Sequence, residues 1–194
     1  PQHRFFSFVI VENRVLLADA LDLGEYCRLW MHNGLMEDAD GKLSKSRGER
    51  LSLAAIFDDC PPAALRFYLL QYHYRDFTPF SETALKAACA EGEQLGWTAA
   101  EVLTADGGNP DGGGRDENPH GDAQLARGDP PTAALLARLE AGLDDDLDSP
   151  QAVAALRELE PLARERLGGG GELRAVAALY RIFQRALGVF QWPS

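Results

Sequence analysis

The last third of this 194-residue chain carries three stripes of apolar residues, and they limit the fold more than any other feature. In each stripe the apolar side chains recur every three or four residues, which places them along one face of an α-helix. Because a helix must bury its apolar face, three consecutive stripes predict an antiparallel helical bundle, whose leucines we interpret as core. Ser149-Pro150 marks the start of the second helix, and Gly168–Gly171 separates it from the third. The stripes are Leu135, Leu136, Leu139 and Leu143; Val153, Leu156, Leu159, Leu162 and Ala163; and Leu173, Val176, Leu179, Tyr180, Phe183, Leu187 and Phe190.

A segment rich in backbone breakers, residues 104–131, precedes these stripes. Within it, Asp106–Asp122 combines glycine, proline, asparagine and acidic residues and has no apolar periodicity. A chain of this composition cannot bury enough apolar surface to offset the entropy of ordering it. We therefore expect residues 104–131 to be a flexible linker.

The N-terminal part predicts a small α/β region. Phe5–Val11 is an apolar run with the length of a buried strand, and Glu12–Asp22 follows it as a short helix. The turn dipeptides Asn33-Gly34 and Asp40-Gly41 indicate that Arg28–Met36 and the residues after it form strands that meet at a turn.

Helices are expected between this region and the linker. Leu51–Phe57 predicts one helix, and Ala63–Tyr72 predicts another that begins after a proline pair. Ser81 is a suitable N-cap for a third helix, which we expect to run to about Leu95. The predicted fold class is therefore mainly α, with a short α/β remnant followed by the bundle. The predicted domains are residues 1–103, 104–131 and 132–194.

Charge and cysteine content exclude several kinds of protein. The chain has 19 lysines and arginines and 30 aspartates and glutamates, and the net charge of −11 argues against a protein that coats nucleic acid or binds DNA. A basic loop can still bind a phosphate, because salt screens carboxylates farther away than about 8 Å. No apolar run has the roughly 20 residues of a membrane-spanning helix. Three scattered cysteines, Cys27, Cys60 and Cys89, predict no disulfide and no zinc site, as in a cytoplasmic protein.

One short basic loop carries residues suited to chemistry. Lys42-Leu43-Ser44-Lys45-Ser46 places two ammonium groups and two hydroxyls between Asp40-Gly41 and Arg47-Gly48. Charge-assisted donors of this kind stabilise a pyrophosphate leaving group, which gains negative charge as its bond to the α-phosphate breaks. Taken alone, the same residues also fit a solvated basic turn.

In its context the loop resembles the KMSKS signature of the cysteinyl-tRNA synthetases, which are class I aminoacyl-tRNA synthetases. Leu43 stands where the signature usually has methionine. The resemblance covers nearly the whole chain, and its motifs follow the order they have in the family. They are Leu29–Gly34, Lys42–Gly48, Ala64–Leu70, His73–Arg75, Phe80–Glu82 and, past the expected linker, Leu143–Ala152.

The resemblance implies ATP and tRNA as ligands and a ligase role in protein biosynthesis. Lys45, the second lysine of the signature, would bind the ATP phosphates while an aminoacyl-adenylate forms. Lys42, Ser44 and Ser46 would shape the loop. The helices from Leu51 onward would form the stem-contact region, and those after residue 131 would form the tRNA-binding bundle.

The resemblance also implies that this chain holds no complete catalytic site. The family's His-Ile-Gly-His signature and the cysteine ligands of its zinc would lie upstream of Pro1. Phe8–Arg14 aligns with the family's Phe-Pro-His-His-Glu-Asn-Glu, so Ile10 and Arg14 stand at two zinc-ligand positions. Isoleucine has no lone pair and a guanidinium repels a cation, so we expect the zinc site to be lost.

Several other polar residues have a structural interpretation beside the functional one. His32 and His73 titrate near neutral pH, but adenylate formation depends on positioning and charge rather than proton transfer, so we expect both to be structural. Asp144-Asp145-Asp146 suits magnesium in ligand type, yet consecutive residues at a helix end point in different directions. The bundle arginines fit a solvated surface better than an RNA face, because glutamates alternate with them. They are Arg157, Arg164, Arg166, Arg174, Arg181 and Arg185.

Three functions remain open on the sequence alone. The first is a truncated, divergent cysteinyl-tRNA synthetase relative that cannot aminoacylate tRNA by itself. The second is one half of a split cysteine ligase that works with a separate catalytic chain. The third is a non-catalytic interaction module whose basic loop is a relic. In addition, the exposed edge of the strand Phe5–Val11 predicts self-association.

Overall fold

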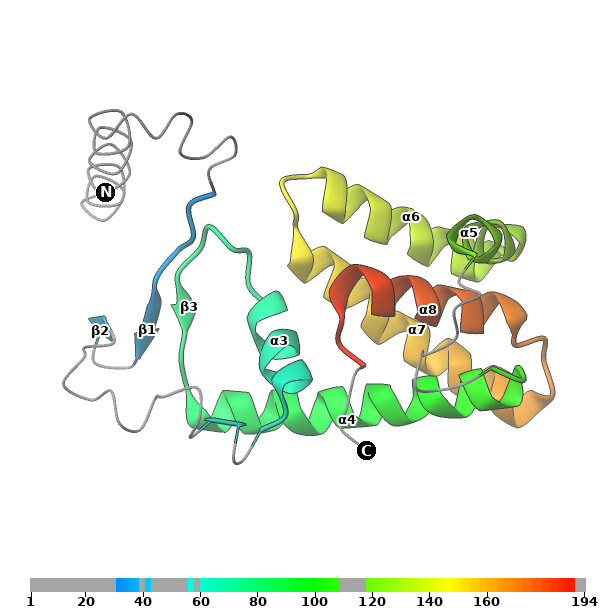
Figure 1. Cartoon of the computed structure of the whole chain (residues 1–194), viewed down its shortest axis with the longest axis horizontal. Helices are drawn as coiled ribbons and strands as arrows, with labels where there is room; N and C mark the ends of the chain where they lie inside the picture. Colours follow the sequence, from blue (N-terminus) through cyan, green and yellow to red (C-terminus); the bar gives the residue numbers. More distant parts are fainter. Residues whose placement is uncertain (1–30, 39–40, 43–55, 58–59, 109–117, 191–194) are drawn as a thin grey trace, which may run out of the picture. The chain divides into compact units, whose positions relative to one another are not determined.

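The computed structural model describes residues 31–38, 41–42, 56–57, 60–108 and 118–190. The chain divides into two compact units, residues 1–34 and 35–194. The second unit is mainly helical, as predicted, and contains one small sheet (Figure 1). The strand predicted at Phe5–Val11 and the helix predicted at Glu12–Asp22 lie outside the described residues. No helix in the described ranges is long and apolar enough to cross a bilayer.

A three-stranded sheet has the order β2-β1-β3. Its central strand, β1 (Met36–Asp38), pairs antiparallel with β2 (Gly41–Lys42) and parallel with β3 (Thr78–Pro79). The β1–β2 pair, with Asp38 opposite Gly41, confirms that strands meet at a turn near the predicted dipeptide Asp40-Gly41. Residues 31–35 form no strand, so the strand prediction was wrong there. The strand begins only at residue 36, because from there on the backbone pairs with β3 and, from Glu37, also with β2.

Two helices follow the local start signals that the sequence carries. α3 (Pro62–Leu70) begins at the predicted proline pair, where the first turn tolerates a missing N–H donor. α4 (Glu82–Ala105) is capped by Ser81, whose Oγ accepts a hydrogen bond from the Ala84 N–H at 3.3 Å. The helix continues well past its predicted end at Leu95, because three residues farther along keep its apolar face buried. They are Ala99, Val102 and Leu103.

Four helices form the bundle, and three of them were predicted. These are α6 (Pro130–Asp144), α7 (Ser149–Gly169) and α8 (Arg174–Leu187). The start of α7 differs in detail, because Asp148 rather than Ser149 caps it and accepts a hydrogen bond from the Gln151 N–H at 3.2 Å.

The fourth bundle helix, α5 (Pro119–Gly128), lies inside the segment that we expected to be a flexible linker. That expectation was wrong for residues 104–105, which end α4, and for residues 118–131, which form α5 and the start of α6. Asn118 accepts a hydrogen bond from the Gly121 N–H at 2.9 Å, and Pro119 occupies the first turn. Ala126 on the inner face of α5 is fully buried. A cap, a proline and one apolar contact therefore outweigh the breaker-rich composition around them.

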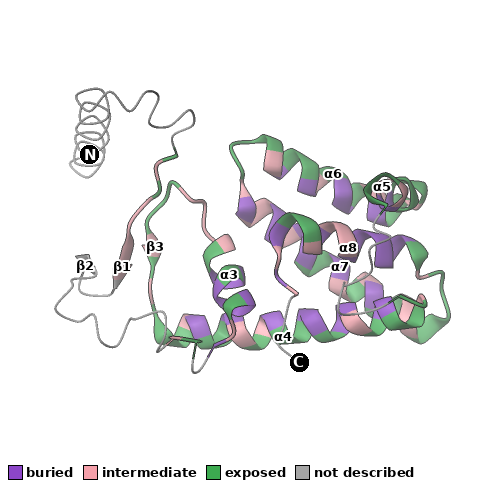
Figure 2. Cartoon of the chain, viewed as in Figure 1, coloured by how far each residue is buried: buried purple, intermediate pink, exposed green. Residues whose placement is uncertain are grey.

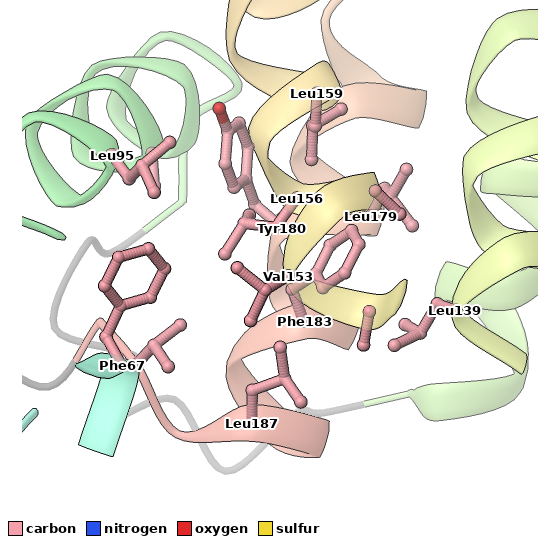
Figure 3. Packing of buried hydrophobic residues seen from close by; sticks show 14 of the residues in the cluster. Phe67, Leu95, Leu139, Val153, Leu156, Leu159, Leu179, Tyr180, Phe183 and Leu187 are labelled. Carbon is pink, nitrogen blue, oxygen red and sulfur yellow. The ribbon is translucent and has the colours of Figure 1, made fainter. Parts of the chain in front are cut away.

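One apolar core joins α3 and α4 to the bundle, and the buried faces of the helices turn toward it (Figure 2). In its centre, Phe183 and Tyr180 of α8 lie among leucine and valine side chains of α7 (Figure 3). The Tyr180 hydroxyl is buried and has no hydrogen-bond partner among the described residues, and burial raises its pKa. The predicted division at residues 104 and 131 stays a prediction.

Two of the cysteines form a disulfide, although the sequence predicted none. Cys60, just before α3, pairs with Cys89 of α4 as a disulfide, with their Cα atoms 6.4 Å apart. The expectation that these cysteines are unpaired was wrong. Their separation of 29 residues gives no sequence signal, because only the packing of α3 on α4 brings them together.

Reducing the Cys60–Cys89 pair is expected to lower the free energy of unfolding by about 2 kcal/mol. The cross-link restricts the unfolded chain, and loop-closure entropy for a 29-residue separation corresponds to about 3.5 kcal/mol, of which disulfides often deliver only part. Urea unfolding with and without a reductant measures it. The variant Cys89→Ser serves as the control, since its stability should not respond to the reductant. Equal stability of the wild-type chain in both conditions would contradict the pairing.

Candidate functional site

The lysine–serine motif begins on a hydrogen-bonded hairpin. Its first residue, Lys42, ends β2 and lies opposite Glu37 of β1. Ser44, Lys45 and Ser46 lie outside the described residues, so their role in binding ATP stays a prediction.

Hydrogen bonds attach this hairpin to the segment that follows α3. The backbone N–H of Thr78 donates to the Leu35 carbonyl at 2.9 Å, and that of Phe80 donates to the Glu37 carbonyl at 2.5 Å. The hydroxyl of Tyr68, on α3, donates to the Pro79 carbonyl. Burial raises the pKa of Tyr68, which keeps this hydroxyl protonated as a donor. The sheet is therefore fastened to α3 at the strand opposite the motif.

The segment between α3 and β3 also contacts the turn between α6 and α7. Asp146 accepts hydrogen bonds from the Tyr74 hydroxyl at 2.7 Å and from Nε and Nη2 of Arg75 at 2.5 and 2.9 Å. The Arg75 guanidinium is the main cause that lowers the pKa of Asp146 to about 2. Sequence reasoning singled out both segments but missed their contact, because 71 residues separate Arg75 from Asp146.

This cluster shows whether the acidic run Asp144-Asp145-Asp146 is better interpreted as a magnesium site or as a structural helix end. Arg75 and Tyr74 occupy both carboxylate oxygens of Asp146, and the guanidinium supplies the positive charge that a magnesium ion would supply. His73 has a structural contact, as expected, since its Nε2 lies 3.2 Å from the Asp146 carbonyl oxygen. Within the described ranges, no three His, Cys, Asp or Glu side chains are grouped to hold a metal ion.

The same turn holds two non-glycine residues in the left-handed region, Asp146 at φ 52° and Leu147 at φ 57°. Leu147→Gly is expected to raise the free energy of unfolding by about 0.5–1 kcal/mol, because glycine adopts this conformation without the clash of a Cβ. Leu147 is 46% exposed, so little buried surface is lost.

Thermal unfolding measures the effect of Leu147→Gly. The matched control is Leu125→Gly, because Leu125 is similarly exposed but helical, and the change should destabilise α5 by about 1 kcal/mol. A loss of stability in both variants would contradict the strain at Leu147.

The bundle arginines are largely paired within the protein. Arg157 contacts Glu91 at 2.5 Å, Arg164 contacts Glu160 at 2.8 Å, and Arg166 contacts Asp129 at 2.8 Å. Arg181 and Arg185 both contact Asp122, at 2.9 and 2.8 Å. Five of the six arginines considered for an RNA face are thus neutralised by carboxylates, which favours the interpretation as a solvated surface.

A hollow of about 450 Å³ lies between α5 and the start of α8, and its wall carries both charges. Arg166 in that wall already donates to Asp129 and, at 3.0 Å, to the Glu172 carbonyl oxygen. Glu172 and Arg174 also line the hollow. A triphosphate requires an excess of free donors, so we do not place a nucleotide in this hollow.

Comparisons with known proteins cover both the hairpin and the bundle. A family model described as "tRNA synthetases class I (C) catalytic domain" matches residues 6–90, which include the lysine–serine motif. The "Cysteine--tRNA ligase" of Paenarthrobacter aurescens (strain TC1) is 31% identical over 81% of this chain and 29% of its own length. The protein of the same name from Geobacter sulfurreducens is 31% identical over 88% of this chain and 34% of its own length. That from Hydrogenovibrio crunogenus is 27% identical over 95% of this chain and 35% of its own length. The chain thus spans about a third of these relatives.

Proposed function

Because this chain belongs to the cysteinyl-tRNA synthetase family, we propose that it binds ATP phosphates through its lysine–serine motif and tRNA through its helical bundle. The observation that carries the proposal is the position of Lys42–Ser46. The motif lies within the matched residues 6–90 and begins at the end of β2, on a hairpin that β3 fastens to α3. The two lysines of the motif would supply charge-assisted donors to the phosphates of ATP.

The proposed chemistry assigns one role to each kind of side chain in the motif. In adenylate formation the cysteine carboxylate attacks the α-phosphate in line, and pyrophosphate leaves. Lys45 would stabilise the charge that develops on pyrophosphate, and Lys42 would support the loop. Ser44 and Ser46 would donate hydrogen bonds that shape it.

We propose further that this chain does not aminoacylate tRNA alone. Ile10 and Arg14 stand where the family has zinc ligands. Neither side chain can donate a lone pair to zinc at neutral pH, so thiolate recognition of cysteine by that metal would be lost.

Nucleotide binding and pyrophosphate exchange test the proposal together. The chain should bind a fluorescent ATP analogue, and Lys45→Ala should weaken that binding at least tenfold. Lys86→Ala, which removes an exposed lysine on α4, is the matched control and should bind as the wild type does. The chain should show no cysteine-dependent exchange of pyrophosphate into ATP.

Each contrary result points to a different function. Robust cysteine-dependent exchange by this chain would refute the catalytic part of the proposal. Exchange that requires an added chain with the His-Ile-Gly-His signature would favour a split ligase. Equal nucleotide binding, or none, in the wild type and Lys45→Ala would refute the ATP site and favour an interaction module.

A further inference from the structure

The contact of Asp146 with the residues after α3 joins the bundle to the hairpin that carries the motif. Asp146 accepts one hydrogen bond from Tyr74 and two from Arg75, and we call these three residues the Asp146 latch. A second contact lies beside it, where the Ser149 hydroxyl donates to the Tyr72 carbonyl at 3.3 Å. The turn between α6 and α7 is thus fastened at two points to one short segment.

The backbone conformation of this turn indicates that the Asp146 latch also constrains the turn itself. Asp146 and Leu147 are both left-handed, and two adjacent non-glycine residues adopt that conformation only where the surroundings enforce it. The left-handed conformation places the Asp146 carboxylate within reach of both Tyr74 and Arg75. Backbone strain at this turn is therefore coupled to the contact.

A short series of hydrogen bonds leads from the latch to the motif. Arg75 is followed by β3, which pairs with β1 through the Thr78 and Phe80 N–H groups. β1 in turn pairs with β2, where Glu37 lies opposite Lys42. After the side-chain contacts of Asp146 with Tyr74 and Arg75, every step from Arg75 to Lys42 is either a covalent connection of a few residues or a backbone pair.

We propose that Asp146 is a positioning residue, which fixes to the helical bundle the hairpin from which the lysine–serine motif departs. Asp146 does not touch a substrate in this role and acts through Tyr74, Arg75 and the strand pairs. One consequence rests on the function proposed above: RNA bound to the bundle changes the order of the hairpin through the latch.

Hydrogen exchange of the full chain without ligand tests the positioning role by itself. Asp146→Asn is the variant of choice, because asparagine adopts the left-handed region as readily as aspartate but cannot form the ion pair. Amide exchange at residues 35–42, Thr78 and Phe80 is expected to accelerate about threefold, as befits the loss of a half-exposed ion pair, while exchange in α8 stays unchanged. Asp145→Asn removes a neighbouring charge and should exchange as the wild type does.

A second, milder variant keeps the test valid if Asp146→Asn does not fold correctly. Tyr74→Phe removes one of the three hydrogen bonds to Asp146 and should give an intermediate acceleration in the same residues. Unchanged exchange of residues 35–42 in Asp146→Asn and Tyr74→Phe would overturn the proposal. Faster exchange throughout α8 as well would also overturn it, because Asp146 would then serve general stability.

Adding cysteine tRNA tests the proposed tRNA binding separately from the positioning role of Asp146. In the wild type, RNA should slow exchange at residues 41–42, and Asp146→Asn should bind RNA equally but lose this slowing. If the wild type binds no RNA, the proposed tRNA function fails while the comparison without ligand still decides the latch. If RNA slows exchange equally in both chains, the coupling through Asp146 is refuted.

Discussion

Phe183→Ala is expected to lower the free energy of unfolding by about 4 kcal/mol, the largest effect of any single change considered for this chain. Phe183 lies on α8 with none of its surface exposed, among residues of the central core (Figure 3). Truncating a buried phenylalanine loses its transfer free energy and leaves a cavity, and together these cost about 3–5 kcal/mol. A domain of this size is stable by about 5–15 kcal/mol, so the loss is a large fraction of the total.

Urea unfolding followed by circular dichroism measures this loss. Tyr180→Phe is the matched control one turn earlier on α8, because it keeps the ring and removes a buried hydroxyl that lacks a hydrogen-bond partner in the described part of the chain. We expect that change to be neutral or slightly stabilising. A cost below about 1 kcal/mol for Phe183→Ala would mean that α8 is not packed in the centre of the bundle.

Asp122→Asn is expected to cost about 3 kcal/mol, the second-largest effect. Asp122 on α5 is 7% exposed and accepts from Arg181 at 2.9 Å and from Arg185 at 2.8 Å. Removing one partner of a buried ion pair costs about 3–5 kcal/mol. The two arginines are partly exposed, so solvent offsets some of that cost.

The Asp122 prediction also tests whether α5 belongs to the folded bundle. Glu140→Gln is the control, because Glu140 pairs with Arg127 at an exposed position and its loss should cost less than about 1 kcal/mol. Thermal unfolding of the two variants compares a buried pair with an exposed one. Equal, small losses in both would indicate that α5 is not anchored by Asp122.

Features that depend on a few neighbouring residues were predictable from the sequence. The proline pair before α3, the Ser81 cap of α4 and the apolar stripes of the bundle each act within one or two helical turns. The start of α5 used the same kind of signal, Asn118-Pro119, but the surrounding glycines and acidic residues obscured it. The end of α4 was misplaced because burial of Val102, rather than a local stop signal, extends the helix.

Features that depend on tertiary contact were not predictable. The Cys60–Cys89 pair and the Asp146 latch join residues 29 and 71 positions apart, and no local sequence signal says which distant residues will meet. The pairing of Asp122 with Arg181 and Arg185 also arises only when α5 packs against α8. In the candidate site, only the motif itself and its place after a hairpin could be inferred from sequence.

Binding of cysteine tRNA across a salt series tests the central claim most directly. The account predicts saturable binding that prefers this tRNA over bulk RNA. The affinity should fall about tenfold between 50 and 200 mM salt, which corresponds to about two phosphate contacts. Such a weak dependence is expected because carboxylates neutralise most bundle arginines. No binding above the bulk-RNA control at any salt concentration would contradict the account.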